Sequence, residues 1–143
     1  MPKHICYKWN FVEGVNPFLW KLLEEIRQEG IDLVDVELKQ VRNTLVVKVT
    51  GELDMLIADN LRSIIDEKLN EGTVRNLIIN LEKVTFVDSS GLGVIIGRYK
   101  KMTSTEGRMY IVGAKPNVEK ILRFSGINKL IPLYKNEQEI INI

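Results

Sequence analysis

The spacing of apolar residues changes several times along the chain, and each change predicts a new element. Alternating, β-branched positions over 36–38 and 45–49, with a short turn at 42–43, predict a β-hairpin. The apolar residues then fall three and four positions apart, which predicts an amphipathic helix that Asp54 caps and Gly72 ends. This region therefore opens with a hairpin and continues into a helix.

Strand-like and helix-like patterns go on alternating to the end of the chain. They are a short buried strand over 77–81, a helix with an apolar stripe from Leu92 to Met102, a strand over 109–112, a helix from Pro116 to Gly126, a short strand over 131–134 and a last helix capped by Asn136. The predicted order is β-β-α-β-α-β-α-β-α. Because parallel strands joined through helices need right-handed crossovers, we expect an α/β fold. Its mixed sheet should have four or five strands, with the helices mainly on one face.

Residues 1–33 stand outside this rhythm and have signals of their own. Aromatic residues alternate over 7–11 as on a strand, and the Asn-Pro pair at 16–17 can start an amphipathic helix that Gly30 closes. We therefore expect an ordered N-terminal extension, a strand-like segment plus a helix, followed by a domain of residues 34–143.

Three interpretations of the extension stay open. It contacts a partner or a second copy of the chain, or it covers the exposed edge or open face of its own sheet. The third is that the natural protein begins later. Residues 28–30 can be encoded by a purine-rich run resembling a bacterial ribosome-binding site, and Leu33 or Val34 can be encoded by alternative start codons.

Composition narrows the classes of function. The 143 residues are 45% hydrophobic and 27% charged, which suits one globular domain, and the formal net charge of +1 offers no strong field for nucleic acid or an anionic membrane. Cys6 and His4 are the only residues of their kinds, so we expect no internal disulfide, no Cys/His metal site and no His-based triad. Without a run of roughly 18 apolar residues, we expect a cytoplasmic protein with no membrane span, and we expect no cofactor.

The segment Asp88-Ser89-Ser90-Gly91 stands where a loop meets a helix. The Ser89 hydroxyl is expected at the N-cap or one residue outside it, near the unpaired amides of the first turn. Those amides and the helix dipole attract an anion, so a phosphate on Ser89 would gain about 0.3–1 kcal/mol there. The alternative is that the two serines only cap the helix.

Two glycines follow in the same helix. At about 100° per residue, Gly93, Val94 and Gly97 fall on the side facing away from the apolar stripe. Each exposed glycine destabilises the helix by roughly 1 kcal/mol relative to alanine, which indicates that something approaches the backbone closely. A protein partner or another helix of the same domain would explain the pattern equally well.

A second acidic turn, Gly-Glu-Leu-Asp at 51–54, joins a strand to the first helix. If the strands before the two helices are parallel neighbours, both helix N-termini open at the same sheet edge, where α/β folds commonly bind ligands. Asp54 and Asp88 would then lie near Ser89. A phosphate there, with about −1.5 to −2 charges, would be repelled by these carboxylates and by a docked acidic or apolar surface. Asp54 is also a plain N-cap, and both roles can hold together.

The turn at 51–54, the run 86–100 and the tail 113–133 closely resemble the anti-sigma factor antagonist family, whose members are STAS domains. The resemblance covers about residues 34–143 and does not reach residues 1–33. Its Asp-Ser-Ser-Gly-Leu-Gly motif, followed by Gly-Arg-Tyr-Lys, is specific. The resemblance implies a binding protein rather than an enzyme.

The resemblance also implies a partner-switching cycle. The unphosphorylated chain would bind an anti-sigma factor that is a serine kinase, and so release the sigma factor. The kinase would use ATP to phosphorylate Ser89, the first serine of the pair, and a serine phosphatase would restore it. The expected partner-binding residues are Glu52, Asp54, Asp88, Ser90, Gly91, Gly93, Val94 and Gly97.

Three other functions remain as alternatives. An enzyme with Ser89 as nucleophile lacks the Gly-x-Ser-x-Gly elbow and a histidine nearby in sequence. Nucleotide binding lacks a Gly-rich phosphate loop with Lys-Ser or Lys-Thr. A STAS signalling module of a stress-response assembly or a membrane transporter predicts repeated subunits or a covalent neighbour, which the short chain does not favour.

Overall fold

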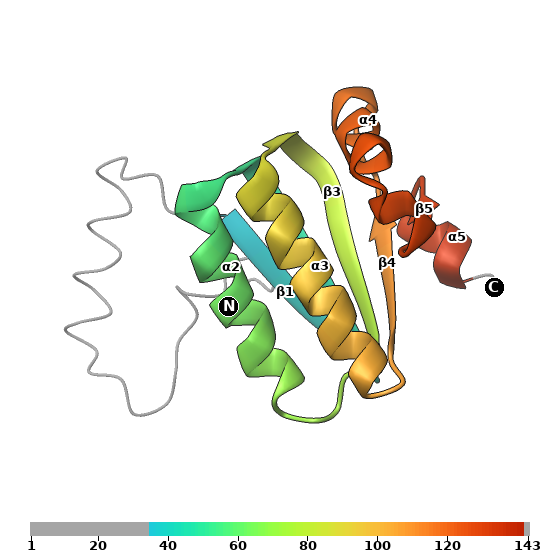
Figure 1. The fold of residues 1–143 in the computed structure, drawn as a ribbon. Helices are drawn as coiled ribbons and strands as arrows, with labels where there is room; N and C mark the ends of the chain where they lie inside the picture. Colours follow the sequence, from blue (N-terminus) through green and yellow to red (C-terminus); the bar gives the residue numbers. More distant parts are fainter. Residues whose placement is uncertain (1–34, 142–143) are drawn as a thin grey trace.

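The computed structural model in Figure 1 describes residues 35–141, so the strand and helix predicted within residues 1–33 lie outside the described residues. The elements follow one another in the predicted order. They are β1 Asp35–Val41, β2 Thr44–Leu53, α2 Met55–Leu69, β3 Asn76–Val87, α3 Ser89–Ser104, β4 Arg108–Val112, α4 Pro116–Ser125, the 3₁₀ turn η2 Ile127–Lys129, β5 Leu133–Tyr134 and α5 Glu137–Ile141.

The strands form one five-stranded mixed sheet in the order β1-β2-β3-β4-β5. β1 and β2 are the predicted antiparallel hairpin, with Val41 paired to Thr44 across its turn. The remaining neighbours, β2 with β3, β3 with β4 and β4 with β5, are parallel. The predicted α/β class and the mixed sheet are therefore confirmed.

The core lies between this sheet and the two long helices. α2 and α3 run side by side across one face of the sheet (Figure 1). Val47, Ile79 and Ile111 are paired across three neighbouring strands and are at most 2% exposed, in one cluster with the buried side chains of both helices. The apolar residues of the strands and the stripes of the helices thus bury one another.

Two element boundaries differ from the predicted ones. β3 extends over 12 residues, well past the predicted 77–81, because its second half pairs with the end of β2 through two register shifts. Exposed polar residues in that half interrupt the apolar run, so the sequence pattern predicts a strand that ends too early. Helix α2 ends at the cap Asn70, and Gly72, predicted as its end, lies in the following turn with a φ of 80°.

Candidate functional site

Helices α2 and α3 begin beside each other at one edge of the sheet. β2 and β3 end as parallel neighbours, with Leu53 paired to Val87, and the backbone N–H of Asp88 donates to the Leu53 carbonyl at 3.2 Å. Both helix N-termini therefore open at the carboxyl end of the parallel strands, at the top of Figure 1, as the sequence predicted.

Two aspartates organise this edge. Asp88 is the N-cap of α3, where its Oδ1 accepts from the Gly91 N–H at 3.0 Å, while its Oδ2 accepts from the Met55 N–H of α2 at 3.2 Å. Asp54 caps α2 and accepts from two N–H groups of its first turn at 3.0 and 3.3 Å. Glu52, at the end of β2, is exposed beside them. The Asp88 carboxylate therefore joins the first turns of both helices and satisfies amides that have no partner within a helix.

Ser89 is the first residue inside α3, and it is exposed. The prediction that its hydroxyl lies at the N-cap or one residue outside is wrong, because Asp88 takes the cap and its negative charge is favoured by the helix dipole. The Ser89 hydroxyl makes no hydrogen bond to another residue of the range 35–141. Ser89 therefore has no capping role that would explain its presence.

Gly91 has an internal role, although it was predicted as a partner-binding residue. It is buried, and an added Cβ would lie 2.5 Å from the Leu53 carbonyl oxygen and 2.7 Å from the Leu53 Cγ. Glycine is needed there because the start of α3 presses against the end of β2. Gly91 therefore supports the edge from inside the domain.

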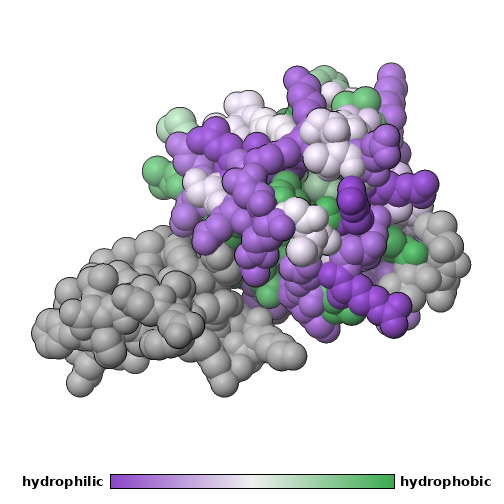
Figure 2. Space-filling model, turned by 90° about the horizontal axis from the view of Figure 1, so that it is seen from below, coloured by the Kyte–Doolittle hydropathy of each residue, from purple (hydrophilic) through white to green (hydrophobic). Residues whose placement is uncertain are grey.

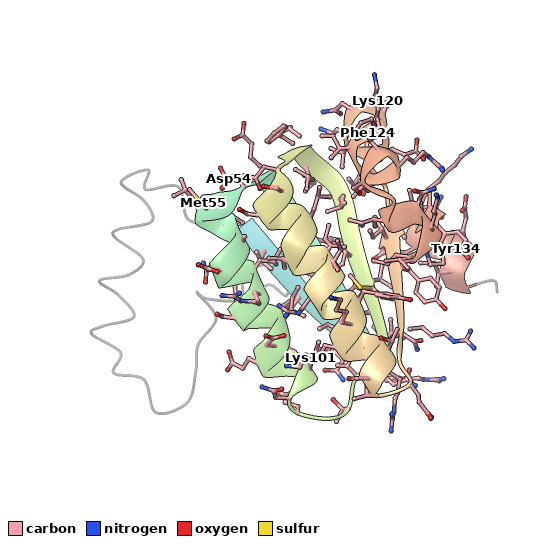
Figure 3. The ribbon with its side chains drawn as sticks, viewed as in Figure 1. Asp54, Met55, Lys101, Lys120, Phe124 and Tyr134 are labelled. Carbon is pink, nitrogen blue, oxygen red and sulfur yellow. The ribbon has the colours of Figure 1, made fainter. Side chains whose placement is uncertain are left out.

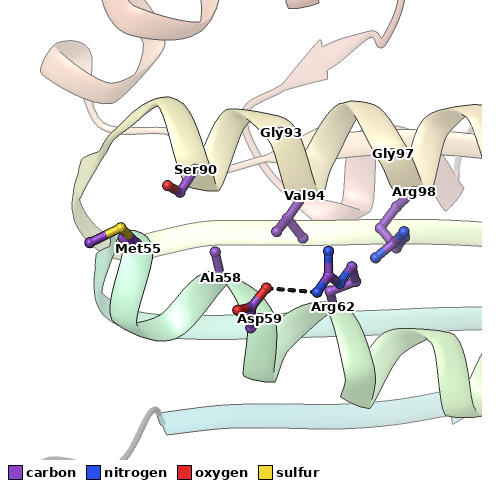
Figure 4. A pocket seen from close by; sticks show the side chains of 9 residues that line it. All are labelled: Met55, Ala58, Asp59, Arg62, Ser90, Gly93, Val94, Gly97 and Arg98. Carbon is purple, nitrogen blue, oxygen red and sulfur yellow. Dashed lines mark hydrogen bonds and ion pairs between the residues drawn. The ribbon is translucent and has the colours of Figure 1, made fainter.

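A groove of about 420 Å³ runs between α2 and α3, with Met55 and Ser90 near one end (Figure 4). Gly93 and Gly97 form the part of its α3 wall that we call the glycine wall. At either glycine an added Cβ would have no atom within 4 Å, leaving aside the glycine's chain neighbours and the helix's own backbone. No helix of the described domain therefore packs against the two glycines. This excludes, for Gly93 and Gly97, the interpretation that another helix of the same domain approaches them.

Val94, predicted to lie on the side of the helix away from the apolar stripe, points toward α2 and is 7% exposed (Figure 4). Because α3 packs against α2 as well as against the sheet, the interpretation that another helix of the same domain packs there holds for Val94. Its buried side consequently includes Val94 and Arg98 as well as Ile95 and Met102. The apolar stripe read from the sequence marks only the side of α3 that faces the sheet, and it does not predict the contact with α2.

Arg98 is a buried charge that the sequence analysis did not single out. It is 8% exposed, and its Nε lies 3.2 Å from Oδ1 of Asp66 on α2, an oxygen that is also 3.5 Å from Nζ of Lys101. Burial lowers the pKa of Arg98, the Asp66 charge opposes that effect, and the positive charge of Arg62 adds to it. The sequence signals for it are its spacing, one turn after Val94, and its place in the Gly-Arg-Tyr-Lys run of the family motif.

Apolar side chains are exposed around the edge that carries Ser89. Met55 and Leu56 in the first turn of α2 are 70% and 84% exposed, Phe86 at the end of β3 is 44% exposed, and Phe124 of α4 is 94% exposed. Figure 3 shows Met55 and Phe124 at the same end of the molecule, whereas the opposite end, seen in Figure 2, is mostly hydrophilic. Exposed apolar groups at one end are typical of a protein contact surface.

Residues 35–141 contain neither a cluster of metal ligands nor a membrane-spanning helix. No three His, Cys, Asp or Glu side chains of this range are placed to hold a metal ion together. None of the helices in the same range combines the length and the apolar character needed to span a bilayer.

Comparison with known proteins identifies the family. Residues 35–140 match the STAS domain. An anti-sigma F factor antagonist of Paenibacillus polymyxa is 36% identical over 104 residues, which cover 73% of this chain and 89% of the relative. The chain therefore belongs to the STAS domain family, and within it to the anti-sigma factor antagonists.

Two solved structures of one relative share the fold. The anti-sigma factor antagonist SpoIIAA in its unphosphorylated form is 31% identical with a TM-score of 0.68, over 75% of this chain and 93% of that one. SpoIIAA, the Bacillus cell fate determinant, in its phosphorylated form is 30% identical with a TM-score of 0.62, over 75% and 96%. These matches confirm the STAS-type arrangement predicted from the sequence.

Proposed function

We propose that this chain is an anti-sigma factor antagonist switched by phosphorylation. In its unphosphorylated form it binds an anti-sigma factor that is a serine kinase, and so releases the sigma factor; phosphorylation of Ser89 ends that binding. The observation that carries the proposal is the exposed position of Ser89 at the start of α3, on an edge that also exposes apolar side chains. Support comes from SpoIIAA, which has been solved in unphosphorylated and phosphorylated forms.

The proposed contact surface surrounds Ser89. Its acidic residues lie on the two connections that lead from β2 and β3 into the helices. Its apolar residues lie in the first turn of α2, and its residues without side chains form the glycine wall of the groove. The residues proposed to touch the kinase are Glu52, Asp54, Met55, Leu56, Asp88, Ser90, Gly93 and Gly97. Gly91 and Val94 are buried and hold this surface in place from inside.

A phosphate on Ser89 acts locally in this proposal. It adds about −1.5 to −2 charges at a helix N-terminus, where the free amides of the first residues attract it. The Gly91 amide is already bound to Asp88 at 3.0 Å, so the phosphate also lies close to an existing carboxylate. The domain should tolerate this charge while it faces water. A docked partner would bury it without compensation, which commonly costs several kcal/mol.

The cycle needs two further proteins. The kinase transfers the γ-phosphoryl group of ATP to the Ser89 hydroxyl oxygen and releases ADP and a proton. A serine phosphatase then hydrolyses the phosphoserine with water and releases inorganic phosphate. Because ATP is the phosphoryl donor, we place the cycle in the cytoplasm. The chain itself contributes the acceptor serine and the binding surface, and no catalytic group.

Serine variants test the switch. Ser89→Ala should bind the kinase and resist modification, because it lacks the acceptor oxygen, whereas Ser90→Ala should still be phosphorylated. Phosphorylated wild type should bind about 100-fold more weakly or worse, and Ser89→Asp should bind weakly, since each places a charge in the interface. Each variant is incubated with kinase and ATP, the phosphate is located by mass spectrometry, and the dissociation constant is measured by titration. Phosphate on Ser90 alone, or equal affinity before and after modification, would contradict the proposal.

A further inference from the structure

The groove between α2 and α3 has a cationic end. Arg98 of α3 and Arg62 of α2 point toward each other across it (Figure 4). The Arg98 side chain is only 10% exposed, and its Nη1 is buried without a hydrogen-bond partner among the described residues. Arg62 is about half exposed and contacts Asp59 at 2.7 Å. A buried guanidinium group with an unused donor is unusual, because buried charges are normally paired and hydrogen-bonded.

The carboxylates of the domain compensate these cations only in part. Oδ1 of Asp66 faces both Nε of Arg98 and Nζ of Lys101, at 3.2 and 3.5 Å. Neither Oδ1 of Asp66 nor Nε of Arg98 has a hydrogen-bond partner, so their contact is a charge contact without hydrogen-bond geometry. Arg62 pairs with Asp59, so the three cations Arg62, Arg98 and Lys101 face only two carboxylates, those of Asp59 and Asp66. One further negative charge would balance the cluster.

The shape of the groove leaves room for that charge to arrive from outside. The glycine wall has no side chains at positions 93 and 97, and an added Cβ at either would have no atom within 4 Å outside the local helix backbone and chain neighbours. A partner's backbone can therefore approach α3 closely and extend a side chain toward the arginines. The other end of the groove is lined by Ser90 and Met55, so the groove continues the contact surface proposed around Ser89.

We propose that the groove receives one acidic side chain, Asp or Glu, of the anti-sigma factor, and that Arg62 and Arg98 pair with its carboxylate. The inference rests on the proposed function, because it specifies the chemistry of the same partner. The planar guanidinium group suits a carboxylate well, and its hydrogen bonds to a charged acceptor are stronger than neutral ones. A single carboxylate matches the one charge that the cluster lacks.

Arg62 is the residue to change, because it is exposed at the groove and its removal leaves the buried Arg98–Asp66 contact in place. Arg62→Gln should raise the dissociation constant of the complex with the purified cognate anti-sigma factor about tenfold and reduce its salt dependence. Arg62→Lys, which keeps the charge, should stay closer to wild type. Arg123→Gln is the matched control: Arg123 is 55% exposed against 51% for Arg62, and it also pairs with an acid of its own helix, Glu119.

The outcomes separate the inference from the proposed function. If wild type does not bind the anti-sigma factor, the proposed function fails and the inference fails with it. If wild type binds and Arg62→Gln binds equally well, the inference alone is overturned. An equal loss in Arg123→Gln would also overturn it, because total charge and not the groove would then govern binding. Thermal unfolding of each variant verifies that the fold is intact.

Discussion

At the scale of single residues, glycines of one helix serve opposite purposes. Gly91 is required by the domain itself, since the start of α3 lies too close to Leu53 for any side chain. Gly93 and Gly97, within the next two turns, have open space where a Cβ would be. Internal packing therefore explains the first glycine but not the other two, which the proposed partner contact would explain.

Substitution of these glycines should separate the two roles. Gly91→Ala should lower the free energy of unfolding by about 1–3 kcal/mol, because its methyl group overlaps the Leu53 carbonyl. Gly97→Ala should raise it by about 0.5–1 kcal/mol, since alanine favours the helix and meets no neighbour. Urea denaturation measures both values. A loss of stability in Gly97→Ala would show that this glycine serves the fold after all.

The same contrast extends to partner binding. Gly93→Leu should keep the fold, because the position is exposed, yet weaken binding to the anti-sigma factor by filling the glycine wall of the groove. Titration calorimetry against the wild-type complex measures this effect. Normal binding by a well-folded Gly93→Leu protein would remove the glycine wall from the proposed interface.

At the scale of elements, α2 and α3 form one unit through charged contacts at both ends. Asp88 joins their first turns near Ser89, and Asp66 faces Arg98 and Lys101 farther along. The apolar contact between the helices lies between these two points, with Val94 buried in it. The relative position of the helices, and therefore the groove, depends on both contacts.

Asp88 should consequently stabilise two helices at once. Asp88→Ala removes acceptors for the amides of both Gly91 and Met55, so we expect a loss of about 1–2 kcal/mol in the free energy of unfolding. Hydrogen exchange should become faster at both amides. Asp54→Ala is the control, because its acceptor serves α2 alone and the Gly91 amide should keep its protection. Unchanged exchange at Met55 in Asp88→Ala would argue against the bridge.

At the scale of the whole molecule, the buried apolar side chains of residues 35–141 form one cluster that connects the sheet and the helices. Its large, fully buried side chains come from several elements along that range, among them Leu45, Leu77, Ile95, Ile111 and Leu122. The repeating pattern of strands and helices is complete without residues 1–33. We therefore expect the contacts of this domain to suffice for a cooperative fold.

We expect a protein of residues 34–143 to fold alone and to bind the anti-sigma factor like the full chain. Circular dichroism should show one cooperative thermal transition, and titration should give a dissociation constant within about threefold of the full-length value, because the proposed contact residues all lie within the shorter chain. A non-cooperative transition would mean that the extension completes the core. Weaker binding with an intact transition would instead assign the extension to the interface.

The sequence alone determined the order of the elements, the hairpin, the Asp54 cap and helix α4 from Pro116 to its end at Gly126. These features depend on residues a few positions apart in the sequence, so capping residues and the spacing of apolar residues predict them. The resemblance added the STAS arrangement and pointed to Ser89.

Only the tertiary structure decided what surrounds Ser89. Asp88 takes the cap and also reaches Met55, a residue 33 positions away in the sequence. The contact of α2 with α3 buries Val94 and Arg98 and opens the groove beside Gly93. No local pattern encodes these features, because they arise where two helices distant in sequence lie against each other on the same sheet.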